Sequence, residues 1–375
     1  VEELIGRWKP IKGIGITGQM HGIIYVGEQG TAVSPLYTWQ DGRGNEKCKT
    51  GESYVDGFQR LTGYQGATGY GLVTHYYNMK NSLVPKGAVK ICTISDYIAM
   101  KLAGGRQPIM HVTNAASLAG YNQAQKDFDK EKLTRLGIDC DVLPEVTTKP
   151  KVVGSTKEGI SVVVAIGDSQ ASYLGSVKDQ ENTLLINIGT GSQISLYSSQ
   201  PNESKGWESR PFIDQGYILT ASSLCGGRAY GALEGFFTQV SKMLGIERNT
   251  DCYQEMEDWA LKHGDFNPLE VSTLFCGSRV NPLQRGSIQN LGLDNFTPQH
   301  LIHGVLDGMI SELYDLYTSI QKQYKGEIKT LVGSGNGIRR NPMLRQKIEN
   351  VFGMRMDIPN YAEEAAFGAA LFAYL

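Results

Sequence analysis

Runs of apolar residues alternate along the chain with segments in which apolar residues recur every three or four positions. The clearest such segment is Thr297 to Tyr324, whose apolar side chains would share one face of a helix. This alternation, with glycines at the junctions, predicts an α/β architecture. We expect further helices at Gly69 to Leu83, Ser95 to Ala103, Arg228 to Leu244, Pro342 to Phe352 and Glu363 to Leu375, and a strand at Thr330 to Val332.

Two strand-like runs enclose a turn rich in glycine. Leu184 to Ile188 precedes the turn Gly189-Thr190-Gly191, and Gln193 to Tyr197 follows it. This pattern predicts a tight hairpin with backbone amides exposed at its tip. Glycine lets N–H groups converge on an anion and the threonine hydroxyl adds a donor, so we expect the tip to bind phosphate.

Asp168 follows another apolar run, Val162 to Ile166. An isolated aspartate at a strand end is most simply a cap or an ion-pair partner. The hairpin that follows favours a second interpretation, in which Asp168 takes the proton of an alcohol as the alcohol attacks a phosphate. Together the two segments suggest phosphoryl transfer.

The length of 375 residues, with 41% hydrophobic content, predicts two domains. The stretch from Leu143 to Gly159 is rich in Pro, Lys and Thr, so we place the domains at 1–155 and 156–375. Val1 to Trp8 resembles the last turns of a helix, which predicts that the chain begins within a domain. A processed terminus that happens to be helical is the alternative.

Charge and cysteine content narrow the class of ligand. The net charge is -2 and the basic residues are scattered, which gives no support to nucleic-acid or membrane-surface binding and favours a small-molecule substrate. The six cysteines form no CxxC pair, as expected in a reducing compartment. With neither a long apolar run nor a signal peptide in the sequence, we expect a cytoplasmic protein.

Two motifs are misleading. Gly13 to Gly18 matches GxGxxG, and Asp41 lies at the spacing of a ribose-binding acid. A helix end precedes this motif and a strand-like run, Gly22 to Val26, follows it, so we reject a nicotinamide site; a GxxxxGK[ST] loop is also absent. His300-x-x-His303 has no acidic or cysteine partner, so we expect these histidines at the surface and not at a metal.

Two polar segments could bind a sugar. Gln19-Met20-His21 ends the expected strand Ile14 to Thr17, at the sheet edge where α/β proteins bind ligands, although a structural histidine in a turn explains His21 equally well. Trp39-Gln40-Asp41-Gly42-Arg43 combines an aromatic face, a carboxylate and a guanidinium. An Asp-Gly hairpin turn is the simpler alternative there.

Several segments together resemble the FGGY carbohydrate kinases. Their order and spacing span nearly the whole chain: GITGQMHG (15–22), WQDGR (39–43), GDSQAS (167–172), NIGTGS (187–192), RG (285–286), GSGNGIRRNP (333–342) and EEAAFGAALFA (363–373). The resemblance implies two ribonuclease-H-like domains of the actin and hexokinase type, with sugar and ATP meeting in the cleft between them.

The resemblance also implies roles for individual residues. Asp168 would be the general base. The sugar side would be lined by Gln19, Met20, His21, Trp39, Asp41 and Arg43, with Tyr70 as a further candidate. Gly189, Thr190 and Gly191 would face the ATP phosphates, while Gly335 and Asn341 would approach the adenosine; Asn341 also fits a helix N-cap before Pro342. Magnesium should accompany ATP.

Two further segments narrow the expected substrate. ATGYG (67–71) and TNAAS (113–117) resemble the branch of the family that phosphorylates the ketose sedoheptulose to its 7-phosphate. A kinase for xylulose or another ketose is the alternative within the family. The resemblance leaves a homodimer open.

One family feature is missing from this sequence. The family opens with a hairpin that carries an Asp-x-Gly-Thr-Thr-like phosphate loop, and this chain contains no such motif. Segments that follow the loop in the family begin here at Ile14, so we expect a first domain truncated at its N-terminus. The resemblance implies that loss of the loop cripples phosphoryl transfer, so we expect this chain by itself to be inactive. A sugar- or nucleotide-sensing pseudokinase that lacks the loop is the alternative from another functional class.

Overall fold

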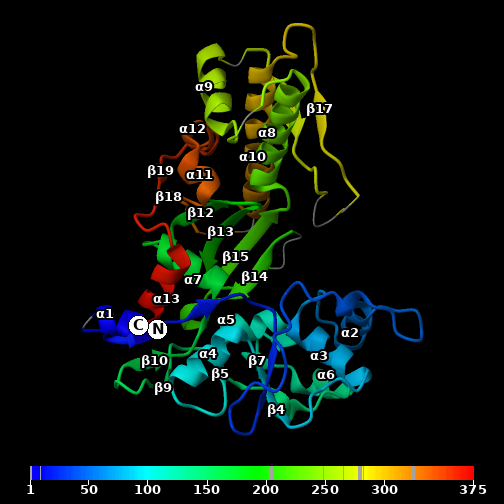
Figure 1. Ribbon diagram of the computed structural model, residues 1–375, viewed down its shortest axis with the longest axis vertical. Coiled ribbons are helices and arrows are strands. Elements are labelled where there is room, and N and C mark those ends of the chain that lie inside the picture. The colour runs from blue at the N-terminus through cyan, green and yellow to red at the C-terminus, as the bar shows by residue number, and fades with distance from the viewer. Residues whose placement is uncertain are drawn as a thin grey trace. The chain divides into compact units, whose positions relative to one another are not determined.

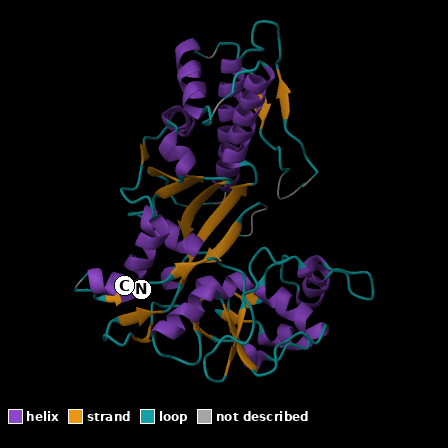
Figure 2. Cartoon of the chain, viewed as in Figure 1, coloured by secondary structure: helices purple, strands orange, loops and turns teal. Residues whose placement is uncertain are grey.

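The computed structural model describes residues 2–8, 10–202, 206–247, 249–264, 266–277, 281, 283–321, 324 and 326–375. The chain divides into two compact units. Unit 1 comprises Val1–Gly175, Arg210–Tyr217 and Glu363–Leu375, and unit 2 comprises Ser176–Ser209 and Ile218–Ala362. Their elements are labelled in Figure 1, and Figure 2 shows that both units mix helices and strands. The domain boundary expected at residue 155 stays a prediction.

The elements of unit 1 occur in the following order along the chain. They are α1 (Glu2–Arg7), β1 (Gly13–Ile14), β2 (Thr17–Gly18), β3 (Ile24–Gly27), η1 (Arg43–Asn45), α2 (Tyr54–Thr62), α3 (Gly71–Lys80), β4 (Ala88–Cys92), α4 (Ile94–Leu102), β5 (Ile109–His111), α5 (Val112–Ala115), η2 (Ala116–Leu118), β6 (Tyr121–Asn122), β7 (Asp127–Phe128), α6 (Lys130–Arg135), η3 (Cys140–Val142), β8 (Glu145–Thr147), β9 (Val152–Ser155), β10 (Ser161–Val163), β11 (Ile166–Gly167), α7 (Asp168–Ser176), η4 (Ile213–Gln215) and α13 (Glu364–Tyr374).

The expected strand from Ile14 to Thr17 is two short strands instead. β1 pairs in parallel with β10, and β2 pairs in parallel with β11. Gly15 lies between them against α13, where a Cβ atom on Gly15 would sit 1.9 Å from the carbonyl oxygen of Ala369. This close approach accompanies the break in the strand. No helix follows Gly18, as the rejection of the nicotinamide motif requires.

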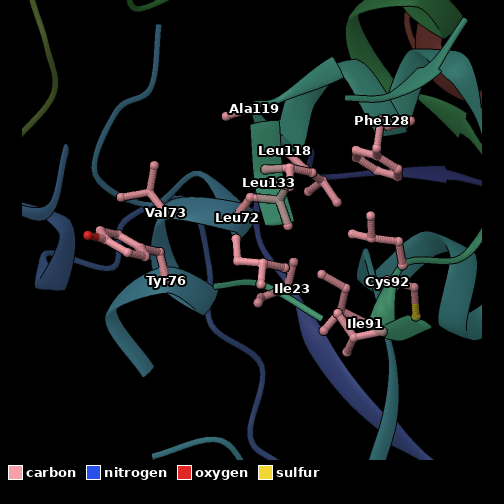
Figure 3. Packing of buried hydrophobic residues seen from close by; sticks show 14 of the residues in the cluster. Ile23, Leu72, Val73, Tyr76, Ile91, Cys92, Leu118, Ala119, Phe128 and Leu133 are labelled. Atoms are coloured by element: carbon pink, nitrogen blue, oxygen red, sulfur yellow. The ribbon is translucent and has the colours of Figure 1, made fainter. Parts of the chain in front are cut away.

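The main hydrophobic core of unit 1 lies among β3, β4, α3 and α6. Figure 3 shows Ile23, Leu72, Leu118, Phe128 and Leu133 packed together, and each is at most 1% exposed. Full burial of a side chain of this size contributes roughly 1.5–3 kcal/mol. The core therefore fixes α3, one face of which lies beside the candidate site described below.

Helix α7 packs closely on α13 through small residues. A Cβ atom at Gly368 would lie 1.8 Å from the carbonyl oxygen of Ala171, and one at Gly175 would lie 2.0 Å from that of Glu364. The glycines at these two positions allow the backbones to touch. The C-terminal helix thus anchors the helix that Asp168 begins.

The elements of unit 2 include a sheet and several longer helices. They are β12 (Thr183–Ile188), β13 (Ser192–Ser198), β15 (Tyr217–Ser223), α8 (Gly226–Met243), α9 (Tyr253–His263), β16 (Glu270–Ser272), β17 (Ser287–Gln289), α10 (Pro298–Gln321), β18 (Thr330–Ser334), α11 (Asn336–Arg340), α12 (Pro342–Phe352) and β19 (Met356–Asp357), while β14 (Glu208–Pro211) crosses the division between the units.

β12 lies in the middle of the sheet of unit 2. It pairs antiparallel with β13, as the hairpin prediction requires, and parallel with β18. The strands β15, β13, β12, β18 and β19 are adjacent in that order. The predicted helices that became α8, α10, α12 and α13 are confirmed within a few residues, although residues 322 and 323 of the expected helix lie outside the described ones.

The prediction that His300 and His303 lie at the surface is wrong. His300 is 0% and His303 7% exposed, on the inward face of α10. The imidazole of His300 contacts the Thr297 hydroxyl at 2.7 Å and the Phe266 carbonyl oxygen at 2.6 Å. Their burial follows from their place on the helix, because they share the inward face of α10 with the buried residues Leu306, Ile310 and Leu313.

Candidate active site

The candidate base lies at the junction of β11 and α7. Gly167 ends the strand and Asp168 begins the helix, where the Ser169 amide donates a hydrogen bond to Asp168 Oδ1 at 2.6 Å. Burial raises the pKa of Asp168, while this hydrogen bond and the charges of His21 and Arg210 lower it; burial prevails. A carboxylate whose pKa lies above its ordinary value is a stronger base toward an alcohol.

The strand before Asp168 is held on both sides by threonine hydroxyls. Thr17 Oγ1 donates to the carbonyl oxygen of Ile166 at 2.9 Å, and the amide of Gly167 donates to Thr113 Oγ1 at 3.0 Å. Thr113 belongs to the TNAAS segment, so that segment fixes the backbone immediately before the candidate base. The carboxylate is therefore placed by a rigid support.

The segment Gln19-Met20-His21 lies beside the same strand. Met20 is buried, and its Sδ atom lies 3.0 Å from the position of a Cβ on Gly167. Gln19 is half-buried. His21 has a φ of 72°, an uncommon value for a residue other than glycine.

His21 is held in that conformation by two neighbours. Its amide donates to Ser117 Oγ at 3.1 Å and its Nδ1 lies 2.8 Å from the Ser117 carbonyl oxygen, which makes Nδ1 the protonated nitrogen. Its ring stacks on Tyr70 with centroids 4.4 Å apart. A strained residue fixed from two sides next to a candidate base is typical of a functional position.

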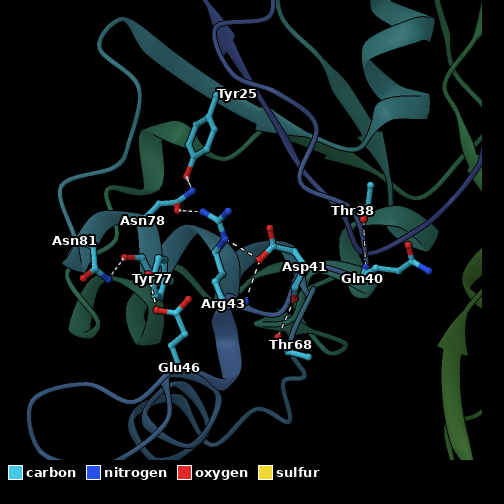
Figure 4. Close-up of polar contacts among 10 residues, drawn as sticks. All are labelled: Tyr25, Thr38, Gln40, Asp41, Arg43, Glu46, Thr68, Tyr77, Asn78 and Asn81. Atoms are coloured by element: carbon cyan, nitrogen blue, oxygen red, sulfur yellow. Dashed lines mark hydrogen bonds and ion pairs between the residues drawn. The ribbon is translucent and has the colours of Figure 1, made fainter.

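Trp39, Asp41 and Arg43 lie on an irregular segment and not on a hairpin turn. A turn at residues 38–41 leads into η1, so the Asp-Gly hairpin alternative is wrong. Arg43 Nε donates to Asp41 Oδ1 at 2.7 Å (Figure 4). Trp39 is 54% exposed, which leaves its ring accessible to a ligand.

The ATGYG segment joins the two sugar-binding candidates. Thr68 Oγ1 donates to the Asp41 carbonyl oxygen at 2.8 Å (Figure 4). Gly69 has a φ of 82°, and a Cβ on it would lie 2.0 Å from the Trp39 carbonyl oxygen. Tyr70 then stacks on His21. Contacts therefore run from segment 39–43 through 67–71 to His21, while Met20 and Thr113 lie against Gly167, the residue before Asp168.

Besides Asp168, which is half-buried, unit 1 contains a carboxyl group that is fully buried, that of Asp96. Asp96 Oδ2 accepts a hydrogen bond from Thr93 Oγ1 at 2.6 Å, and Asp96 Oδ1 accepts one from Asn114 Nδ2 at 3.1 Å. Burial raises the pKa of Asp96 to about 7 although these donors lower it. The folded protein thus holds a proton on Asp96 at pH values where the unfolded chain has released it.

We expect Asp96→Asn to flatten the pH dependence of stability. Because the folded-state pKa lies above the unfolded value, the contribution of Asp96 is present below about pH 4 and is lost as the pH rises to about 7. The variant should therefore gain in urea midpoint relative to the wild type between pH 5 and pH 7.5. The comparison cancels the opposite slopes of His75 and His111, whose pKa values burial lowers to about 4. Parallel curves for the two proteins would refute the assignment.

The hairpin tip of unit 2 has two available amides. Gly189 N donates to the Gly191 carbonyl oxygen at 2.9 Å, while the amides of Thr190 and Gly191 have no acceptor among the described residues. The first turn of α8 satisfies the carbonyl groups of the tip: Gly227 N donates to Gly189 O at 3.1 Å and Arg228 N donates to Thr190 O at 3.0 Å. Thr190 is exposed. The tip can therefore donate hydrogen bonds to an anion.

Gly226 supports the hairpin tip at residues 189–191, and the sequence motifs did not predict this role. It has a φ of 37°, and a Cβ on it would lie 2.2 Å from the carbonyl carbon of Gly191. The Gly226-Gly227 dipeptide marks a turn and could have drawn attention to this position. Arg210, whose Nη1 donates to Ser169 Oγ at 2.9 Å, was also missed and carries no sequence signal.

Gly335 lies at the same sheet edge as the hairpin tip. It follows β18, has a φ of 85°, and a Cβ on it would lie 2.5 Å from the Ile188 carbonyl oxygen. Asn341 is the N-cap of α12, where its Oδ1 accepts a hydrogen bond from Leu344 N at 2.8 Å. The hairpin tip and Gly335 thus lie together at the carboxyl ends of β12 and β18, where open α/β sheets bind ligands, while Asn341 begins the helix α12.

Comparison with known proteins identifies the family. The N-terminal domain model of the FGGY family of carbohydrate kinases matches residues 6–185, and the C-terminal domain model matches residues 184–375. The chain belongs to the FGGY family of carbohydrate kinases. Its two-domain fold is that of this family, of the actin and hexokinase type.

Similar proteins carry the names of several sugar kinases. The chain is 28% identical to the sedoheptulokinase of Mus musculus, over 96% of the chain and 80% of the relative, and 26% identical to glycerol kinase 2 of Saccharolobus solfataricus, over 98% and 75%. Among solved structures, the xylulose kinase of Rhodospirillum rubrum matches with a TM-score of 0.82 at 18% identity, over 98% of this chain and 76% of that one. That likeness supports the fold.

Three further observations concern membrane spans, metal-binding groups and cysteines. None of the helices among the described residues is both long and apolar enough to cross a membrane. The described residues contain no group of three or more His, Cys, Asp or Glu side chains that could hold a metal ion. All six cysteines are free thiols.

Proposed function

We propose that this FGGY kinase transfers the γ-phosphate of ATP to the terminal hydroxyl of a ketose, and that the ketose is sedoheptulose. The observation that carries the proposal is a set of contacts in unit 1 that links four separate segments to one another and to the strand before Asp168. The segments are 19–21, 39–43, 67–71 and 113–117. Beside Asp168 as the base, they provide hydrogen-bonding groups and an exposed aromatic ring, which together suit a polyhydroxylated substrate.

In this proposal Asp168 accepts the proton of the reacting hydroxyl. The hydroxyl oxygen forms a bond to the γ-phosphorus, and the bond between that phosphorus and the oxygen bridging to the β-phosphate breaks, which releases ADP. His21 and Arg210 lie near the Asp168 carboxylate, and their positive charge stabilises its ionised form. Gln19, Met20, His21, Trp39, Asp41, Arg43 and Tyr70 are the proposed sugar-binding residues.

Unit 2 provides the proposed nucleotide-binding residues. The amides of Thr190 and Gly191, next to Gly189, donate to phosphate oxygens, and Gly335 and Asn341 approach the adenosine. Magnesium would neutralise charge on the phosphates and would arrive bound to ATP. The donor set of the described residues offers no ready-made cluster for the ion, so we assign it no protein ligand.

The choice of sedoheptulose rests on the named relatives and on the ATGYG and TNAAS segments. Xylulose or another ketose is the alternative, because a few pocket residues decide between sugars that differ in hydroxyl placement. ADP release should be measured with sedoheptulose, xylulose, glycerol and gluconate, using the protein translated from its whole open reading frame. We expect the highest kcat/KM with sedoheptulose. Absence of turnover with every ketose would overturn the proposal.

A second candidate function is a non-catalytic sensor of sugar or nucleotide. An open reading frame that carries no Asp-x-Gly-Thr-Thr motif would favour it. This candidate predicts ligand binding without ADP release, and it predicts no such motif in frame upstream of Val1. Finding the motif there would exclude the sensor.

A further inference from the structure

A chain of buried polar side chains runs from α3 to Arg43. Asn78 is 0% exposed, and its Nδ2 donates to the hydroxyl of Tyr25 at 3.2 Å. That hydroxyl lies 2.8 Å from Nδ1 of His75, which is also buried. On its other side, Asn78 Oδ1 accepts a hydrogen bond from Arg43 Nη1 (Figure 4). One asparagine therefore connects the core to the WQDGR segment.

The buried partners fix which way the Asn78 amide faces. Burial lowers the pKa of His75 to about 4 and raises that of Tyr25 to about 12, so at neutral pH both groups are uncharged. The Tyr25 hydroxyl then donates to His75 and accepts from Asn78 Nδ2. Only the Asn78 oxygen is left for Arg43, which is the atom that a guanidinium requires.

Arg43 in turn orients Asp41. Its Nε and its backbone amide both donate to Asp41 Oδ1, at 2.7 and 3.1 Å. Its guanidinium also lies over the Tyr37 ring, 4.3 Å from the centroid. Asp41 Oδ2 has no hydrogen-bond partner in the described part of the chain, so one oxygen of the carboxylate is held and the other is available to a ligand hydroxyl.

We propose that Asn78 is a positioning residue for sugar recognition: it holds the Arg43 guanidinium so that Asp41 presents Oδ2 to a sugar hydroxyl. This inference rests on the proposed function, since it takes Asp41 and Arg43 to bind the ketose. Asn78 touches no reacting atom and acts through Arg43. Its loss should therefore weaken sugar binding and leave ATP binding unchanged.

A purely structural role for Asn78 predicts a different result. Removing a buried hydrogen-bonding group destabilises a protein wherever it lies. A structural role would lower the melting temperature and reduce the fraction of active protein, without a change in the sugar Kd of the folded molecules. The sugar Kd is therefore the readout that separates the two roles.

The test is isothermal titration of sedoheptulose into the wild type, Asn78→Leu, Tyr25→Phe and Asn81→Ala. Asn81 ends the same helix, and its Nδ2 donates to the Tyr54 hydroxyl at 3.0 Å and not to Arg43, so Asn81→Ala is the matched control. We expect Kd to rise about tenfold in Asn78→Leu, as for the loss of a hydrogen bond to a charged group. Tyr25→Phe keeps the ring and should raise Kd less, and the control should not change it.

A double-mutant cycle makes the test stricter. With Asp41→Asn in the background, Asn78→Leu should add little further loss, because the group that it positions is no longer a carboxylate. Full additivity, or equal Kd for Asn78→Leu and the wild type, would overturn the positioning role alone. Absence of sedoheptulose binding by the wild type would instead overturn the proposed function, and this inference with it. If Asn78→Leu does not fold, Tyr25→Phe decides: an unchanged Kd there contradicts the proposal.

Discussion

Asp168→Asn lowers kcat by about 10²-fold or more while the sugar Kd changes little, if Asp168 is the general base. Asparagine has nearly the shape of aspartate and can still accept the hydrogen bond from Ser169, so the start of α7 should persist. It cannot accept the proton of the attacking hydroxyl. The measurement is steady-state ADP release at saturating sedoheptulose, with the sugar Kd from titration alongside.

Asp141→Asn is the control for charge removal. Asp141 is an exposed carboxylate in η3 of the same unit, and its replacement should leave kcat unchanged. The wild-type pH profile gives a second check. Burial raises the pKa of Asp168. As the pH is lowered, we therefore expect kcat to begin to fall at a higher pH than it would with an aspartate of ordinary pKa. A kcat near that of the wild type in Asp168→Asn would show that another group takes the proton.

Gly226→Ala raises the KM for ATP, by about tenfold or more, with little effect on the sugar Kd. A Cβ at this position would lie 2.2 Å from the carbonyl carbon of Gly191, and the φ of 37° disfavours any side chain. Relief of the clash must displace the hairpin tip or the first turn of α8. Overpacking of this kind costs roughly 1–3 kcal/mol, and about 1.4 kcal/mol equals a tenfold change in affinity.

Gly235→Ala on the same helix is the matched control. A Cβ there meets no atom within 4 Å, and alanine favours the helix more than glycine does, so both ATP binding and stability should hold. If Gly226→Ala bound ATP as the wild type does, the hairpin tip would not be the phosphate site. If both variants lost ATP binding equally, the cause would lie elsewhere in α8.

The hydrophobic pattern was enough to predict several of the elements of unit 2, but not α9, α11 or the short strands. The β12–β13 hairpin and helix α10 have a strong local signal, since each is a long run of one periodicity. The N-cap at Asn341 was likewise readable, because Asn before Pro at a helix start has a local physical cause. The burial of His300 was not, since polar residues can lie on an inward face when their hydrogen bonds are satisfied.

The candidate site was only partly predictable for a different reason. Its motifs pointed to the candidate residues, but the groups that hold those residues in place come from distant segments. Thr113 bonds the backbone before Asp168 across 54 positions of sequence, and Asn78 reaches Arg43 across 35. Neither contact follows from local spacing. The sequence predicted a role for Thr113 only through the family resemblance, and it placed Asn78 only within a helix.

The most direct test of the central claim is to identify the product. The protein, translated from its whole open reading frame, should be incubated with ATP, magnesium and sedoheptulose beside its Asp168→Asn variant. The sugar should then be analysed by mass spectrometry and phosphorus NMR. We predict a monophosphate ester at the terminal hydroxyl in amounts equal to the ADP formed, and almost none from the variant. Unmodified sugar in the wild-type reaction, or equal product from both proteins, would contradict the account.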